Sequence, residues 1–141
     1  MKITMVFDKP AIYRRTKKKG IFLSRDLAAV VPCGDLDREA FFVVLLDQKN
    51  FVLSIELISL GTLTASLVHP REVFGAALRG QAAAIAFVHN HPSGDTTPSN
   101  QDKQLTKTLC DGANLLGLRV LDHVIIGENG TYFSFRDDGL I

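Results

Sequence analysis

Two histidines, Ser99 and Asp102 lie within fourteen residues of this chain, between positions 89 and 102. His89 and His91 are one residue apart, so on an extended segment both imidazoles point to the same side. Asp102 follows eleven residues after the second histidine, where the chain has turned. Two imidazoles and one carboxylate suit a catalytic zinc ion whose fourth position is open to water. We therefore expect one Zn²⁺ per chain, bound by His89, His91 and Asp102.

A hydrolytic zinc site also needs a base and a donor for the developing oxyanion. Glu39 directly precedes an apolar segment, which would hold it at a strand end facing the site, so we expect it to be the base. Glu56 and Glu72 are the other candidates. Ser99 stands three residues before Asp102, on the same side of a helix start, where its hydroxyl could donate toward the reacting carbonyl.

Part of this pattern has a simpler explanation. Ser99-x-x-Asp102 is close to a helix capping box, which alone could account for both residues. His69 and His123 fit structural or supporting roles better than a ligand role, and Asp122-His123 is a candidate pair behind the metal ligands. A scaffold that binds metal without turnover stays open as well.

The elements that would position these residues alternate between strands and helices. A short helix is expected through residues 26–31, with Ser24 as its N-cap. Further helices are predicted at 70–78 and 99–116, ended by Gly80 and Gly117. Strands are predicted at 41–46, 51–60, 62–68, 82–88, 118–126 and 131–135, with turns at 47–50 and 128–130. This order predicts one α/β domain with a mixed central sheet and helices on both faces.

Charge divides the chain into an arm and a body. Residues 1–20 carry a net charge of +6 and residues 21–141 a net charge of −5. We expect a basic N-terminal arm at 1–20, which could contact nucleic-acid phosphates, and a single domain at 21–141.

No apolar run is long enough to span a bilayer and no secretory signal is evident, so we expect a cytoplasmic protein without a membrane partner. Cys33 and Cys110 are predicted to be reduced.

Glu39 and the segment from His89 to Asp102 resemble the JAMM (MPN+) metallopeptidase motif, which is a glutamate, H-x-H, seven residues, serine, two residues and aspartate. The fuller string H-N-H-P-S-G is similar to the bacterial RadC branch of that group. Other matching segments lie at 38–47, 61–63, 69–74 and 121–127, so the resemblance spans about residues 24–136.

The resemblance implies an MPN fold, a cytidine-deaminase-like α/β sandwich with one zinc ion that hydrolyses peptide or isopeptide bonds. By motif match, Glu39 is the base and Ser99 helps to hold the oxyanion. A protein or peptide substrate is then expected, and the oligomeric state is not indicated.

RadC proteins also carry a DNA-repair label, so a DNA-binding or nuclease protein of repair or recombination is the alternative. Longer RadC proteins have an N-terminal helix-hairpin-helix region that this sequence lacks, which makes a short form our expectation and leaves the basic arm as the only feature favouring DNA. A nucleobase deaminase is excluded because the chain has no P-C-x-x-C pair. A zincin protease is excluded because H-E-x-x-H is missing.

Overall fold

A computed structural model describes residues 19–61 and 67–141 of the chain. Five strands and three helices lie in these ranges, together with a short 3₁₀ turn at Glu128–Gly130. The elements are α2 (Ser24–Val30), β1 (Ala40–Leu46), β2 (Val52–Leu60), α3 (Pro70–Arg79), β3 (Ala84–Asn90), α4 (Asn100–Leu115), β4 (Arg119–Ile126) and β5 (Tyr132–Ser134).

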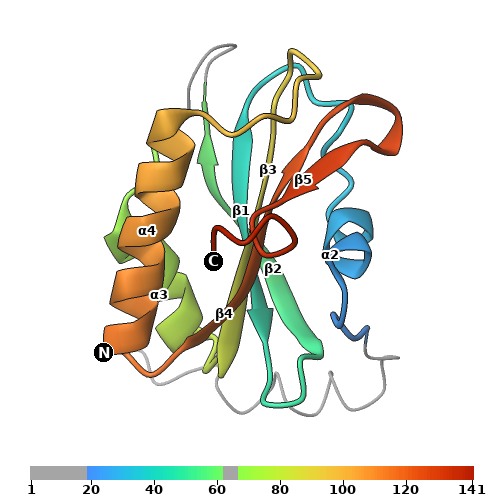
Figure 1. Cartoon of the computed structure of the whole chain (residues 1–141). Coiled ribbons are helices and arrows are strands. Elements are labelled where there is room, and N and C mark those ends of the chain that lie inside the picture. The colour runs from blue at the N-terminus through green and yellow to red at the C-terminus, as the bar shows by residue number, and fades with distance from the viewer. Residues whose placement is uncertain (1–18, 62–66) are drawn as a thin grey trace, which may run out of the picture.

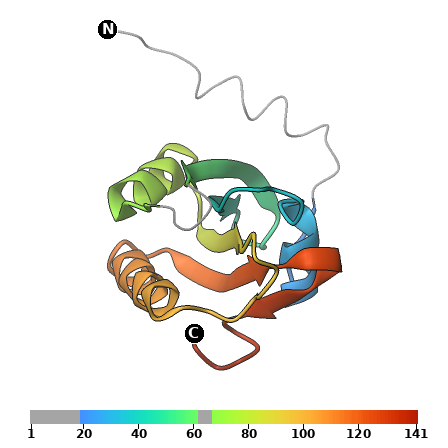
Figure 2. The same ribbon diagram turned by 90° about the horizontal axis from the view of Figure 1, so that it is seen from above.

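The five strands form one mixed sheet in the order β2-β1-β3-β4-β5. Only β3 and β4 are parallel, and α4 is the crossover between them, whereas the other neighbouring strands are antiparallel. Helices α3 and α4 cover one face of the sheet and α2 covers the other, as both views show (Figure 1, Figure 2). The predicted α/β fold, with a mixed sheet between helices, is confirmed.

Strands β1 and β3 lie at the centre because their sequences are apolar on both faces. Alternate residues then enter two separate cores. The core between the sheet and helices α3 and α4 includes Phe41, Val43, Leu45, Ile85, Phe87 and Leu109, and the core under α2 includes Leu27, Val44, Leu46, Ala86 and Val88. Odd-numbered residues of β1 and β3 therefore face α3 and α4.

This parity decides where the candidate site lies. His89 continues the odd-numbered row of β3 and so faces α4, the helix that carries Asp102. Strand β3 extends through Asn90, two residues beyond the predicted end. His89 is therefore part of the strand rather than of the loop after it.

The start of α2 differs from the prediction. Ser24 is the first helical residue and Leu23 is the N-cap. The Asp26 carboxylate accepts hydrogen bonds from the backbone N–H groups of Phe22 and Leu23, so the acceptor at this helix start comes from Asp26 rather than from Ser24.

Two predictions fall largely outside the described residues. These are the basic arm, of which only residues 19 and 20 are described, and the strand at 62–68, of which only residues 67 and 68 are described and belong to no strand. Gly20 forms a bridge with Phe51 beside β2.

Cys33 and Cys110 are free thiols, as expected. Among the described residues, no helix is both long and apolar enough to cross a membrane.

Candidate metal centre

Four side chains from three parts of the fold meet at the end of β3. Glu39 precedes β1, His89 lies in β3, His91 follows it, and Asp102 lies in the first turn of α4. Their ligand atoms all lie within 4.8 Å of one another, so this group could hold a metal ion. Glu56 and Glu72 are not part of it: Glu56 lies in the middle of β2 and Glu72 is exposed in α3.

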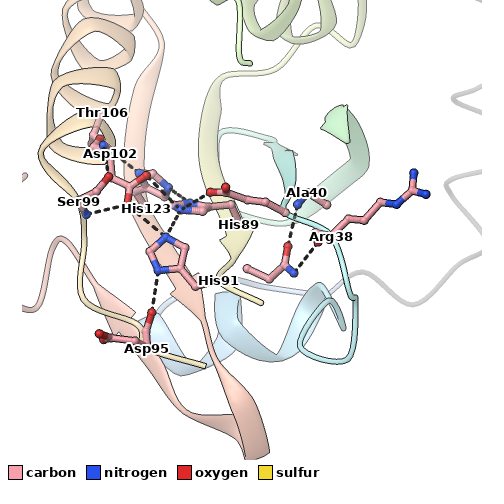
Figure 3. Close-up of polar contacts among 11 residues, drawn as sticks. Arg38, Ala40, His89, His91, Asp95, Ser99, Asp102, Thr106 and His123 are labelled. Carbon is pink, nitrogen blue, oxygen red and sulfur yellow. Dashed lines mark hydrogen bonds and ion pairs between the residues drawn. The ribbon is translucent and has the colours of Figure 1, made fainter. Parts of the chain in front are cut away.

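The distances among the predicted ligands fit a tetrahedral site. The Nε2 atoms of His89 and His91 are 3.0 Å apart, and the Asp102 oxygens lie 3.4 Å and 3.2 Å from those two atoms (Figure 3). With bonds of about 2.0–2.2 Å, ligand atoms of a tetrahedral zinc site are about 3.3 Å apart. The separations of the three side chains, measured to Oδ1 of Asp102 from His89 and to Oδ2 from His91, are thus close to those of a single zinc site.

The hydrogen bond behind His91 fixes which of its nitrogens is protonated. Its Nδ1 lies 2.7 Å from the carbonyl oxygen of Asp95, which can only accept. Nδ1 must therefore donate. In the neutral imidazole this leaves the lone pair on Nε2, directed at the candidate site.

A longer relay fixes His89 in the same way. The Thr106 hydroxyl donates to the carbonyl oxygen of Asp102 (2.7 Å), so it accepts from Nδ1 of His123 (2.6 Å). Burial lowers the pKa of His123 well below its usual range, so this fully buried ring is neutral and its Nε2 is an acceptor. Nδ1 of His89, at 2.7 Å, must donate to that acceptor. The lone pair of His89 therefore also lies on Nε2, facing the site.

Two lone pairs and a carboxylate thus converge on one point, where a cation or a hydrogen-bond donor satisfies them. In the metal-free protein a proton meets this need in part, because the neighbouring Asp102 carboxylate raises the pKa of His91. Burial opposes ionisation of Asp102, but the two histidines beside it outweigh burial and hold the pKa of this carboxyl well below its usual range. The donor set of two imidazoles and an anionic carboxylate is one that zinc prefers.

The alternative explanation for Ser99 and Asp102 describes a real feature of α4. The Ser99 hydroxyl accepts from the Asp102 N–H (3.0 Å), and the Asp102 carboxylate accepts from the Ser99 N–H (2.8 Å). This capping box does not exclude a role for Asp102 in the site, since it is what orients the carboxylate toward His89 and His91.

Glu39 lies beside the predicted ligands rather than among their closest contacts. Its Oε1 is 3.6 Å from Nε2 of His89, and its side chain is 14% exposed. Burial raises the pKa of Glu39, which brings it closer to the range in which a carboxylate exchanges protons near neutral pH.

Sequence reasoning missed three contributors to the site: Thr106, the Asp95 carbonyl and Asn90. It expected His123 in a supporting role with Asp122 as its partner, but the Asp122 carboxylate accepts from the backbone N–H of His123, whereas the His123 ring contacts His89 and Thr106. Thr106, one helical turn after Asp102, could have been found from that spacing. No sequence signal identifies the Asp95 carbonyl or the side chain of Asn90. His69 is the N-cap of α3 and is not part of the group.

Comparison with known proteins places the whole described domain in one group. The model of a family described as "RadC-like JAB domain" matches residues 23–140. The UPF0758 protein STH371 of Symbiobacterium thermophilum is 52% identical over 106 residues, which cover 75% of this chain and 45% of that protein. A UPF0758 protein of Pelodictyon phaeoclathratiforme is 45% identical over an alignment of 147 residues that covers all of this chain and 65% of the relative. The chain thus spans about half to two thirds of the length of these curated relatives.

Proposed function

The chain belongs to the RadC-like JAB domain family, and we propose that it is a zinc-dependent hydrolase of peptide or isopeptide bonds. One observation supports this most strongly: two Nε2 lone pairs and a carboxylate, fixed by hydrogen bonds, converge at 3.0–3.4 Å. Two imidazole lone pairs and an anionic carboxylate aimed at one point are the ligand set that a catalytic zinc ion takes.

In this proposal His89, His91 and Asp102 hold the metal. Zinc bound there would lower the pKa of a coordinated water toward about 7 and polarise the substrate carbonyl. Three protein ligands leave the position for that water.

Glu39 would act as the general base. Its carboxylate lies on the same side of the sheet as the two histidines, and its raised pKa suits a group that accepts a proton from water and returns it to the leaving nitrogen. Ser99 would donate a hydrogen bond to the oxyanion. Its oxygen accepts from the Asp102 N–H, which leaves its own hydrogen for a substrate.

The first experiment is elemental analysis of the purified protein beside an Asp102→Ala variant. About one zinc per chain, lost in the variant, is the expected result. A protein that stays metal-free after zinc replenishment would remove the basis of the proposal.

A Glu39→Gln variant then separates metal binding from turnover on a panel of peptide and isopeptide substrates. It should keep zinc and lose at least about 10²-fold in rate, the smaller end of what a general base contributes. Hydrolysis at the wild-type rate in this variant would rule out the mechanism.

A second candidate function is DNA binding, which only the +6 charge of residues 1–20 favours. Removing residues 1–18 should then abolish an affinity for duplex DNA that weakens with rising salt. No binding by the intact chain near physiological salt would end this candidate.

A further inference from the structure

We propose that Asn90 is a positioning residue that fixes Glu39 against the metal site. The inference rests on the proposed function, because it assigns Glu39 the role of base. Asn90 stands between His89 and His91, its side chain is 1% exposed, and strand alternation directs it away from the two imidazoles. None of the chemistry argued above uses this buried carboxamide.

The Asn90 carboxamide binds the backbone on both sides of Glu39. The Ala40 N–H donates to Oδ1 (2.8 Å), and Nδ2 donates to the Arg38 carbonyl (2.8 Å). A longer contact of 3.5 Å joins Nδ2 to the Leu36 carbonyl. The contacts to Arg38 and Ala40 lie beside the histidines in Figure 3.

This arrangement replaces a missing piece of the sheet. The pairing of β1 with β3 ends at Phe41 and His89. At the next position the Ala40 N–H donates to the Asn90 side chain rather than to a β3 carbonyl, whereas the His91 N–H continues the pairing with β4 by donating to the Ile126 carbonyl. A carboxamide carries one acceptor and one donor group, as a peptide does, so Asn90 continues the ladder by one further step.

The consequence is that the peptide of Glu39 is held from both neighbouring strands although Glu39 lies outside β1. Asn90 bonds the groups on either side of it, and the Glu39 carbonyl accepts from the Gly61 N–H on the β2 side (2.7 Å). Glu39 therefore keeps the parity of Phe41, whose ring stacks on His89, and its carboxylate reaches the site. The segment His89-Asn90-His91 thus presents two candidate ligands on one side and, on the other, the Asn90 carboxamide that holds the backbone of Glu39.

The sharpest variant is Asn90→Asp, which keeps the shape but offers only acceptors, so it cannot donate to the Arg38 carbonyl. The matched control is Asn114→Asp, the same chemical change at an exposed position near the end of α4. Asn90→Ala, which removes the carboxamide without adding charge, serves if the aspartate variant fails to fold.

The probe is Co²⁺ alone, titrated into the full chain in place of zinc, with the visible spectrum of the bound ion as readout. In Asn90→Asp we expect a change of the Co²⁺ spectrum like that in Glu39→Gln, while the Co²⁺ affinity stays within about threefold of the wild-type value. The double variant that carries both substitutions should show no further spectral change, because both act through Glu39. An unchanged spectrum, or an added change in the double variant, would reduce Asn90 to a merely structural residue.

Crystal structures of the Co²⁺-loaded proteins provide the second measurement. The Glu39 carboxylate should move by about 1 Å or more in Asn90→Asp, a displacement large enough to cost about 10²-fold in rate, while His89 and His91 stay in place. A Glu39 that keeps its position would overturn the inference. A wild-type chain that binds Co²⁺ but hydrolyses nothing would end the proposed function and leave this positional test intact, whereas a chain that binds no Co²⁺ would end both.

Discussion

His123 shows how a single buried residue can decide whether two others are ligands. The ring is fully buried, yet its acceptor nitrogen is what requires His89 to be protonated on Nδ1. The hydrogen bonds run from His89 in β3 through His123 and Thr106 to the carbonyl of Asp102 in α4. They therefore also connect β3 to α4 at two candidate ligands, His89 and Asp102.

We predict that His123→Leu weakens zinc binding by about 10- to 100-fold, because His89 loses the acceptor that holds its ring. Thr106→Val should have a smaller effect in the same direction, since it leaves the His123 ring in place but removes its partner. Competition with a chromophoric chelator measures both affinities. His69→Gln, in the N-cap of α3, is the control, and wild-type affinity in His123→Leu would refute the relay.

Ser99 caps α4 and, in the proposed function, would also bind the oxyanion, so one substitution would confuse the two roles. Ser99→Ala should lower the free energy of unfolding by about 1 kcal/mol, because α4 loses the oxygen that caps the Asp102 N–H. Ser99→Thr keeps a hydroxyl and should lose little. Urea unfolding of the metal-free proteins measures the cap alone, and equal stability of the alanine variant would show that the cap contributes nothing.

The residues of the site differ in how far the sequence could predict them. Glu39, His89, His91, Ser99 and Asp102 could be named because strand alternation and the helix start are local patterns. Asn90 could not be named, and His123 was expected in a supporting role without its partners His89 and Thr106. The role of His123 depends on which residue of β4 lies beside β3, and that of Asn90 on where the pairing of β3 with β1 ends.

At the scale of elements, the loop at 92–98 must pass close to the end of β4. A Cβ atom on Gly127 would lie 2.6 Å from the Gly94 carbonyl oxygen and 2.6 Å from a methyl carbon of Thr96. This loop carries the Asp95 carbonyl that orients His91. Gly127 is therefore required because a side chain would clash at this position. Its backbone conformation does not demand glycine, since its φ is −109°.

Gly127→Ala should lower the free energy of unfolding by about 1–3 kcal/mol, the usual cost of overpacking, and weaken zinc binding by displacing Asp95. Gly75→Ala in α3 is the opposite control. Its new methyl group would meet only the flexible end of Arg79, so that variant should gain about 0.5–1 kcal/mol from helix propensity. Thermal and chelator titrations of both variants check the pair, and unaltered zinc affinity in Gly127→Ala would separate the loop from the site.

The elements themselves were largely predictable, and the exceptions have physical causes. Long apolar or amphipathic segments such as β1 and α4 were identified within a residue or two of their bounds. The start of α2 was misassigned because Ser24 is a frequent N-cap residue, whereas here the acceptor is a carboxylate inside the first turn. Strand order could not be deduced, since it depends on contacts between segments distant in sequence.

At the scale of the molecule, the candidate metal site joins a central strand of the sheet to the helix that covers it. β3 supplies one ligand from the centre of the sheet, and α4 supplies another from the layer that covers it. A metal bound only by the folded chain stabilises that chain in proportion to the logarithm of its concentration over Kd. Zinc should therefore raise the melting temperature of the whole domain.

The sign of the pH dependence follows from His91. Its pKa is raised beside Asp102, so the protonated pair stabilises the metal-free fold below about pH 6.5, the ordinary histidine value, and this contribution is lost as pH rises through the raised pKa. Zinc must displace the same proton, so its affinity increases with pH, by up to about tenfold per unit below that pKa. Both effects point in one direction: saturating zinc should raise the melting temperature more at pH 8 than at pH 6.

Calorimetry with and without zinc at the two pH values measures this difference, and Asp102→Ala is the control because it removes both the partner of His91 and a candidate ligand. Equal increments at both pH values in the wild-type protein would mean that His91 carries no proton for the metal to displace. A larger increment at pH 6 would contradict the assignment of His91 as a ligand, because a protonated imidazole cannot bind zinc through the nitrogen that faces the site.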